Sequence, residues 1–292
     1  MKRYLTLTLL GLLALSAISC QRAKESPDDV LEAKKFPVEF TASMGAFSTK
    51  ATDSAFGDGD VIGIFAFDPI DKYNVRAVVS AGGAVSPQES IRWELVEDVE
   101  FLAYYPYVSN LESLDYSFSV KTDQTIYENY RSSDISTAQV TAEYATKVAL
   151  NFSHRMSRLT VNAVCEDASD EIVSVTLGRL VVDAVVDLEA ASSSAGTKKD
   201  FIRAGKAVSG NGGTGWVAIL VPQTIQLPLE IHTRKGGVIT ATLDTPATFE
   251  EGFAYMTSLI KVPSADSSRE VSFSVTVADW DDDGTLSFIK TQ

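Results

Sequence analysis

The stretch FPVEFTASMGAFSTKATDSAFGDGDVIGIFAF, from Phe36 to Phe67, decides the fold predicted for this chain. Its first eight residues alternate between apolar side chains and polar residues or proline. The apolar positions that share one face are Phe36, Val38, Phe40 and Ala42. This period of two is that of a β-strand with one buried face. We therefore predict a strand over residues 36–43.

A second strand follows after a polar connector. The segment Gly57-Asp58-Gly59-Asp60 has the composition of a tight turn, because glycine adopts positive φ and aspartate hydrogen-bonds nearby backbone. Val61 to Phe67 is almost wholly apolar and is predicted as the next strand. The connector contains one basic residue, Lys50. The sequence thus predicts a first strand that is joined to its domain by a segment open to proteolysis.

Residues 1–19 have the pattern of an export signal. Lys2 and Arg3 give a positive start, and Leu5 to Leu15 is an apolar run too short to span a bilayer comfortably. The segment ending in Cys20 (AISC) resembles a lipobox, in which this cysteine is diacylated and becomes the mature N-terminus. The acyl chains would then anchor the protein in a membrane. The alternative is an ordinary secretory signal followed by an incidental cysteine.

Composition favours a folded, acidic protein. The chain has 292 residues, 45% hydrophobic and 22% charged, which is enough for two domains. Removal of residues 1–19 takes away two positive charges and changes the net charge from −14 to −16. Such a protein repels phosphate backbones, so no nucleic-acid partner is expected. Cys165 then has no internal disulfide partner and is interpreted as a buried small apolar residue.

From Phe36 onward, short runs rich in β-branched and aromatic residues alternate with turn-forming residues. We predict an all-β fold of two tandem antiparallel β-sandwich domains. Within this pattern, residues 132–145 are interpreted as one short helix or an irregular loop, and 191–214 as a long polar loop. The predicted organisation is a signal peptide (1–19), a lipidated tether (20–35), an N-terminal domain (36–152) and a C-terminal domain (153–292).

Several segments, taken in order, resemble the fimbrillin family, the Mfa-like or fimbrillin-like subunits of type V pili. The segments that carry the resemblance are GDxIGIF at 59–65, Trp93, FLAYYP at 101–106, DQ at 123–124, SDI at 133–135, FSHRMSRL at 152–159, W…LVPQT at 216–224 and VADWDDDG at 277–284. They cover nearly the whole of the chain after the signal. The resemblance implies two transthyretin-like β-sandwich domains in a structural, non-enzymatic protein.

The resemblance also implies a mechanism of assembly. Family members reach the outer membrane as lipoproteins, and shaft subunits are cut after a basic residue that follows the first strand. Loss of that strand opens a groove, which a strand from the next subunit fills. By position, the cut falls between Lys50 and Ala51, although the family residue is usually arginine. The strand to be removed would carry Phe36, Val38 and Phe40 out of the fold.

The tail of the chain is a candidate donor strand. Leu286 and Phe288 share one side of the segment TLSFIKTQ and could fill a neighbour's groove, or the tail could be one more edge strand. The expected function is a subunit of fimbriae that is trimmed, polymerises with other fimbrial subunits and supports adhesion. The alternative is an untrimmed lipid-anchored adhesin, or a tip or anchor component, that binds a glycan or protein receptor on a host or bacterial surface. The expected location is the outer membrane and the extracellular fimbrium.

Other candidate sites are weaker. His154 and His232 have no metal-ligand spacing around them, so no zinc site is predicted, and no catalytic residue or cofactor is proposed. Residues 279–284 match the first half of a calcium loop through Asp279, Asp281 and Asp283, but Lys290 stands where a bidentate glutamate is required. The aromatic run over 101–110 could be a sugar platform, and its alternation favours core packing.

Overall fold

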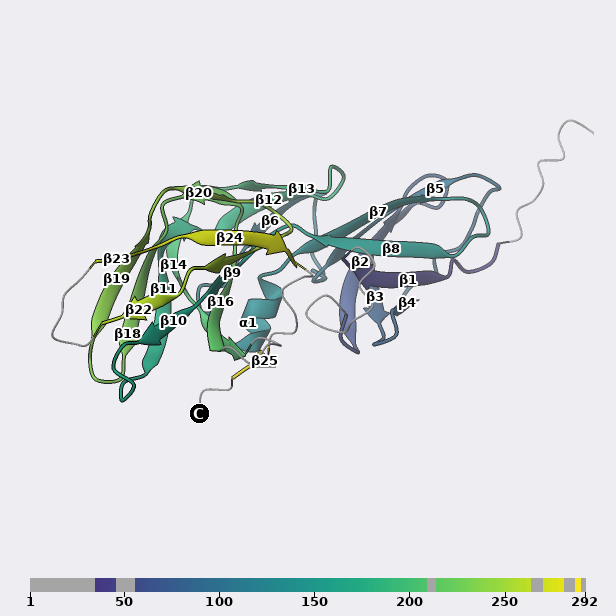
Figure 1. Ribbon diagram of the computed structural model, residues 1–292. Coiled ribbons are helices and arrows are strands. Elements are labelled where there is room, and N and C mark those ends of the chain that lie inside the picture. The colour runs from purple at the N-terminus through teal and green to yellow at the C-terminus, as the bar shows by residue number, and fades with distance from the viewer. Residues whose placement is uncertain (1–34, 46–55, 209–213, 264–269, 281–286, 290–292) are drawn as a thin grey trace, which may run out of the picture. The chain divides into compact units, whose positions relative to one another are not determined.

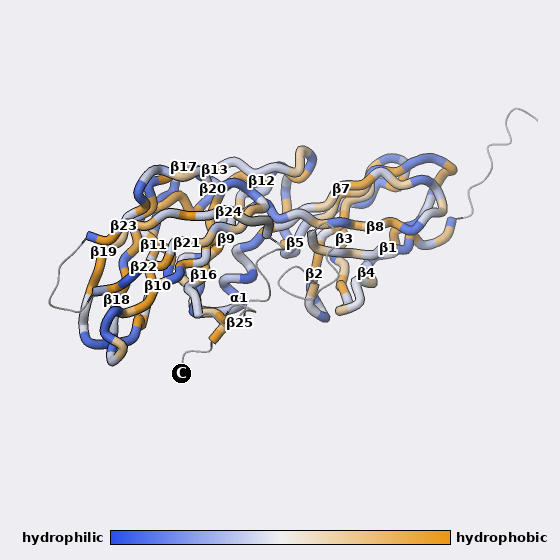
Figure 2. Tube along the Cα trace, viewed as in Figure 1, coloured by the Kyte–Doolittle hydropathy of each residue, from blue (hydrophilic) through white to orange (hydrophobic). Residues whose placement is uncertain are grey.

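The computed structural model describes residues 35–45, 56–208, 214–263, 270–280 and 287–289. The described residues all belong to one compact unit. The described part contains twenty-five strands and one short helix, which confirms the all-β prediction (Figure 1). Figure 2 shows apolar residues along the strands and hydrophilic residues in the turns. This distribution is the one expected when strands bury one face.

The first sheet closes into a barrel in the order β1-β4-β3-β2-β5-β7-β8. Most neighbouring pairs are antiparallel, and β1 and β8 are parallel. A cis peptide bond precedes Pro106 at the end of the fifth strand. The strands of the barrel are β1 (Phe40–Met44), β2 (Asp60–Ala66), β3 (Lys72–Val79), β4 (Ala84–Pro87), β5 (Val99–Tyr105), β7 (Ser136–Ala142) and β8 (Val148–His154).

The remaining strands form five further sheets. A six-stranded sheet has the order β24-β21-β9-β16-β15-β25, and a five-stranded sheet has the order β14-β11-β18-β19-β23. Their members are β9 (Ser157–Val161), β11 (Ile172–Val181), β14 (Lys199–Arg203), β15 (Gly205–Val208), β16 (Thr214–Leu220), β18 (Pro228–Thr233), β19 (Val238–Leu243), β21 (Phe253–Thr257), β23 (Val271–Phe273), β24 (Val275–Asp279) and β25 (Ser287–Phe288).

Smaller sheets complete the described fold. They have the orders β13-β12-β6, β10-β22 and β17-β20. Their strands are β6 (Asp115–Ser119), β10 (Ala163–Cys165), β12 (Asp183–Asp187), β13 (Ser192–Ala195), β17 (Gln223–Ile225), β20 (Ala247–Phe249) and β22 (Ile260–Val262). Because β6 pairs with β12, residues that precede β7 of the barrel share a sheet with residues beyond 180. The division into domains at 152/153 remains a prediction.

Two expectations about connecting segments were wrong. The single helix, α1 (Tyr127–Ser132), ends where a helix or loop was expected to begin, and β7 occupies 136–142. The segment expected to be a long polar loop over 191–214 contains β13, β14 and β15. These strands are short, and backbone pairing stabilises them more than local composition does: β13 pairs with the preceding strand β12, β15 with the following strand β16, and β14 with β11.

The apolar residues gather in two cores. The smaller one lies inside the barrel and consists of residues between Val38 and Phe152. The larger one includes residues from Phe65 to Trp280, among them the inner faces of β9, β11, β16 and β18. Phe65, Leu102 and Tyr104 of the barrel strands belong to this larger core. Both alternating faces of β2 and β5 are therefore buried.

Candidate functional site: the first strand and its groove

The strand β1 completes the barrel between β8 and β4 (Figure 1). It runs parallel to β8, with residues 40–44 opposite 148–152, and pairs with β4 through Phe40 and Thr41. Backbone hydrogen bonds join Val148 N–H to the Glu39 oxygen at 2.9 Å and Ala42 N–H to the Gly83 oxygen at 2.8 Å. Both neighbouring strands thus depend on β1 for part of their pairing.

The side chains of β1 alternate as the sequence predicts. Val38, Phe40, Ala42 and Met44 are buried in the barrel core, and the residues between them are exposed or half-buried. The Phe40 ring meets the Phe101 ring edge to face, with 5.3 Å between centroids. Such a contact adds to the area that the ring buries. The apolar face of β1 is therefore an integral part of this core.

Backbone hydrogen bonds and one ring contact also fix the residues before β1 to the rest of the fold. Val38 N–H donates to the Ile91 oxygen at 2.9 Å, and Trp93 N–H donates to the Phe36 oxygen at 3.1 Å. Phe36 is half-buried, and its ring packs edge-on against Tyr144 at 5.7 Å. Regular strand begins at Phe40, and an isolated bridge at Pro37 precedes it. The predicted strand over 36–43 is thus an extended segment that continues to Met44.

One glycine shapes the groove beside β1. Gly83 has φ +78, and a Cβ added there would lie 2.5 Å from the Ala42 carbonyl oxygen. Only glycine tolerates both the left-handed conformation and this approach. Gly83 therefore lets the turn between β3 and β4 (residues 80–83) reach the backbone of β1.

The chain is anchored again at Phe56, after the connector. Phe56 is 7% exposed, and its ring packs edge-on against Tyr105 at 5.6 Å and Phe152 at 5.0 Å. The predicted turn follows, and Asp60 at its end accepts a hydrogen bond from Gly57 N–H at 2.7 Å. Asp60 also pairs with Arg131 of α1. Contacts with β5, β8 and α1 thus hold the chain at Phe56 and at the turn that follows it.

The other predicted positions of this site are only partly described. Cys20, Lys50, Ala51 and Leu286 lie outside the described residues. Phe288 lies in β25, which pairs with β15, and its ring contacts Tyr127 at 5.2 Å and Tyr130 at 4.8 Å. The tail is thus an edge strand in this structure. The close approach of Phe288 to Gly205 of β15, where a Cβ would lie 2.3 Å away, explains the glycine there.

His154 is part of a buried polar cluster that the sequence does not reveal. It is 4% exposed, and its Nδ1 lies 2.8 Å from Asp134 Oδ2 and 3.3 Å from Ser136 Oγ. The Trp280 indole stacks on the imidazole, with 4.1 Å between centroids and 11° between planes. These residues are distant in sequence, so no local pattern signals the contact. Serine and aspartate share one ring nitrogen, an arrangement that differs from a hydrolase triad.

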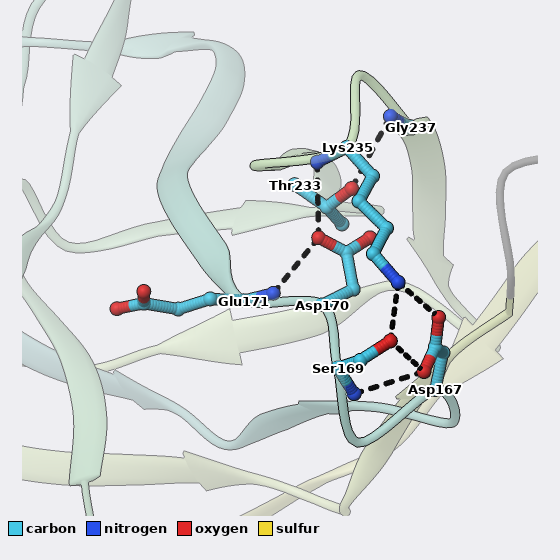
Figure 3. Close-up of polar contacts among 7 residues, drawn as sticks. All are labelled: Asp167, Ser169, Asp170, Glu171, Thr233, Lys235 and Gly237. Atoms are coloured by element: carbon cyan, nitrogen blue, oxygen red, sulfur yellow. Dashed lines mark hydrogen bonds and ion pairs between the residues drawn. The ribbon is translucent and has the colours of Figure 1, made fainter.

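Figure 3 shows a second polar network, between the loop before β11 and the turn joining β18 to β19. Lys235 Nζ lies 2.7 Å from Asp167 Oδ2 and also contacts the Ser169 hydroxyl. Asp170 Oδ1 accepts from the backbone N–H groups of Glu171 at 2.8 Å and Lys235 at 3.0 Å. The lysine contact holds the pKa of Asp167 well below its usual range. This network ties two exposed loops together, and exposed ion pairs of this kind contribute little stability.

Cys165 lies beside this network and is half-buried, so the expectation of a buried residue holds only in part. Burial raises the pKa of its thiol, and the neighbouring carboxylates add to this effect. The thiol is the less reactive form of cysteine. The structure therefore offers no activated nucleophile at this position.

Residues 101–105 of the aromatic run over 101–110 are core, as its alternation favours. Phe101 and Tyr105 face the barrel core, and Leu102 and Tyr104 face the larger core. The Tyr104 hydroxyl bonds with Asn74 and with the backbone of Val108. The rings of Phe101, Tyr104 and Tyr105 are buried and therefore provide no exposed platform for a sugar. Among the described residues no group of three or more histidine, cysteine or acidic side chains could hold a metal ion.

The partial match to a calcium loop, for which no site was predicted, lies mostly outside the described residues. Asp281 and Asp283 lie outside the described residues, and so does the side chain of Asp279. His232 is half-buried, and its Nε2 lies 2.5 Å from Glu230 Oε1 on the same strand. Within the described ranges, the helix found is too short to cross a membrane.

The fold and the groove define an all-β protein whose own N-terminal strand completes its first sheet. The sequence model of the fimbrillin-like family matches residues 49–280. The chain therefore belongs to the fimbrillin-like family, and it is a fimbrial or adhesion subunit of the cell surface. This family is one of structural proteins rather than enzymes. No curated protein matches the sequence.

Solved structures share the fold at low identity. A proposed cell adhesion protein from Bacteroides ovatus is 17% identical, with a TM-score of 0.68, and the match covers 88% of this chain and 99% of that chain. Another from Bacteroides uniformis is 20% identical, with a TM-score of 0.65 and coverage of 84% and 98%. The tip fimbrial protein Mfa3 from Porphyromonas gingivalis is 10% identical, with a TM-score of 0.51 and coverage of 84% and 100%. At these identities the likeness shows the fold alone.

Proposed function

We propose that this chain is a structural subunit of type V-like fimbriae that polymerises by strand exchange. It is exported as a lipoprotein acylated at Cys20, and a protease cuts it between Lys50 and Ala51. The cut releases β1, and a strand from a neighbouring subunit takes its place. The observation that carries this proposal is that one N-terminal strand closes the barrel between β4 and β8.

The groove left by β1 offers a large binding free energy. Val38, Phe40 and Met44 are each at most 8% exposed. Burial of such a side chain is worth about 1.5–3 kcal/mol. A donor strand that fills the three core positions left by these side chains therefore gains roughly 5–9 kcal/mol. The unpaired backbone of β8 and β4 would add ladder hydrogen bonds to an incoming strand. An open edge of this kind also associates nonspecifically, so retention of β1 until export protects the subunit.

The anchoring of Phe56 supports a cut within residues 46–55. Those residues join the end of β1 to a side chain that is itself packed on Tyr105 and Phe152. Asp60 and Arg131 hold the following turn. Cleavage in the connector therefore separates β1 from the body and leaves the ring contacts of Phe56 with Tyr105 and Phe152 and the Asp60–Arg131 pair in place.

The donor strand is proposed to come from the tail, through Leu286 and Phe288. Phe288 is half-buried against Tyr127 and Tyr130 of its own chain. In the part of the tail that the structure describes, Ser287 and Phe288 pair with β15 and Ile289 N–H donates to the Lys206 oxygen, so this described pairing is short. A tail that acts as donor would exchange this short pairing for the longer groove of a neighbour.

A second candidate function is an untrimmed adhesin, or a tip or anchor component, that stays attached through its lipid and binds a glycan or protein receptor. Lys50 stands where the family usually has arginine, and this difference favours an uncut chain. In that case β1 stays in place, and the groove is permanently filled. Both functions share the export signal, the lipid anchor and the outer-membrane location.

The deciding experiment is N-terminal sequencing of the mature protein recovered from the cell surface. A start at Ala51, together with heat-sensitive ladders on denaturing gels, supports the trimmed, polymerising subunit. An acylated Cys20 in a monomeric protein supports the adhesin instead. The Lys50→Ala variant is the control, because it removes the basic residue and leaves β1 unchanged. Ladders that persist unchanged in a chain with Leu286→Asp and Phe288→Asp would exclude the tail as donor.

A further inference from the structure

A cavity of about 280 Å³ lies where the chain passes from β5 to β6. It is lined by one continuous segment, namely Asn110, Leu111, Glu112, Ser113, Asp115, Tyr116 and Ser117. Pockets for drug-sized ligands are usually about 300–1,000 Å³. The volume therefore suits a smaller ligand, such as a single sugar ring.

The apolar part of the cavity is made by Tyr116 and Leu111. The Tyr116 ring lies 6.1 Å from Tyr104 and 5.9 Å from Phe118, between ring centroids. Leu111 packs on the larger core. A tyrosine hydroxyl is protonated at neutral pH and can donate a hydrogen bond, and burial raises the pKa of Tyr116 further above its usual value. A half-buried tyrosine thus offers a ligand both an aromatic surface and a polar tip.

The segment that carries the cavity is fixed at both ends. Before it, the Tyr104 hydroxyl accepts a hydrogen bond from Val108 N–H at 3.1 Å and lies 3.0 Å from the Val108 oxygen. At its other end, Leu188 N–H donates to the Leu114 oxygen at 3.0 Å. A buried tyrosine and the sheet of β12 therefore hold the lining in place before any ligand arrives. Such preorganisation reduces the entropy lost on binding.

The lining also limits the chemistry of the ligand. In the described part of the molecule, four of its side chains make no hydrogen bond to protein: Asn110, Glu112, Asp115 and Ser117. They supply an amide, two carboxylates and a hydroxyl, without any lysine or arginine. Two carboxylates repel an anion, and the described residues hold no group of three ligands for a metal ion. A neutral ligand with several hydroxyls and an apolar face matches these groups.

We propose that this cavity binds a neutral sugar, with Glu112 and Asn110 bonding its hydroxyls and Tyr116 contacting its ring. The site would give the protein a receptor-binding activity of its own. It does not involve β1, β4 or β8, so it is independent of strand exchange. Trimmed and untrimmed chains would bind the sugar equally.

Saturation-transfer NMR on the purified protein tests this inference. The probes are the methyl glycosides of glucose, galactose, fucose and N-acetylglucosamine, with N-acetylneuraminic acid as the anionic comparison. We expect transfer to at least one neutral glycoside and none to the anionic sugar. Loss of one hydrogen bond in Asn110→Ala or Glu112→Ala should weaken binding of that glycoside about tenfold. Tyr116→Phe keeps the ring and should weaken binding less.

The matched control is Glu97→Ala, which removes the same charge from an exposed loop residue outside the cavity. This variant should bind the glycoside as the parent does. The proposal is overturned if none of the neutral probes shows transfer. It also fails if Asn110→Ala and Glu112→Ala bind as tightly as Glu97→Ala, or if the anionic sugar binds as well as the neutral ones. Circular dichroism of each variant confirms that the fold is retained.

Discussion

Replacement of Phe40 by alanine should loosen β1 far more than replacement of its exposed neighbour. Phe40 is 4% exposed, and its ring contacts Phe101 at 5.3 Å. Truncation of a buried phenylalanine costs about 3–5 kcal/mol, from lost burial and the cavity that remains. The β1 strand makes five residue pairs with β8 and two with β4, so this loss falls on a short ladder.

Hydrogen exchange at the Val148 amide measures the effect directly. This N–H donates to the Glu39 oxygen at 2.9 Å, so it exchanges when β1 leaves β8 or when the barrel unfolds. With Phe40→Ala, we expect exchange to be faster by about a hundredfold to several thousandfold, which corresponds to the same 3–5 kcal/mol. Glu39→Ala is the control and should change exchange less than about threefold, because its side chain is exposed. Equal exchange rates of the Val148 amide in the two variants would refute the argument that burial of the Phe40 side chain is a main source of β1 stability.

Three further outcomes follow from single contacts. Gly63→Ala places a Cβ 2.2 Å from the Tyr104 ring, so thermal denaturation should show a loss of about 1–3 kcal/mol, and an unchanged midpoint would contradict the contact. Trp280→Ala removes the stack on His154 and should cost about 3–5 kcal/mol in urea unfolding, whereas Val277→Ala, at a residue 59% exposed, should cost little. Burial raises the pKa of Tyr104 from 10.0 to about 12, so the free energy of unfolding should be insensitive to this group below about pH 10 and should fall between about pH 10 and 12. Tyr104→Phe should reduce that alkaline slope, and an identical slope in parent and variant would contradict it.

The local part of the candidate site could be predicted from sequence. Period-two alternation places Phe40 and Ala42 on the buried face, and the structure confirms it. The glycine and aspartate residues before β2 predict a turn, which the structure also contains. These features depend on neighbouring residues and backbone preferences, so a single sequence carries them.

The rest depends on contacts between residues far apart in the chain. The parallel pairing of β1 with β8 joins residues more than a hundred positions apart, and no local pattern specifies it. Nothing in the local sequence distinguishes Arg131 from other charged residues, yet it forms an ion pair with Asp60 at the start of β2. The pairing of β6 with β12 also cannot be predicted from the sequence, because both are short strands with modest apolar character. Packing against distant partners, rather than propensity, decides these elements.

The separation of the two cores explains how a first strand could be exchanged without loss of the whole fold. The apolar residues of β1 and of the segment before it all belong to the barrel core, and the larger core contains none of them. Phe65, Leu102 and Tyr104 tie the barrel strands β2 and β5 to that larger core from their other face. Release of β1 would therefore open one edge of the barrel while β2 and β5 keep the contacts on their second face. A groove supported in this way can remain structured long enough to accept a new strand.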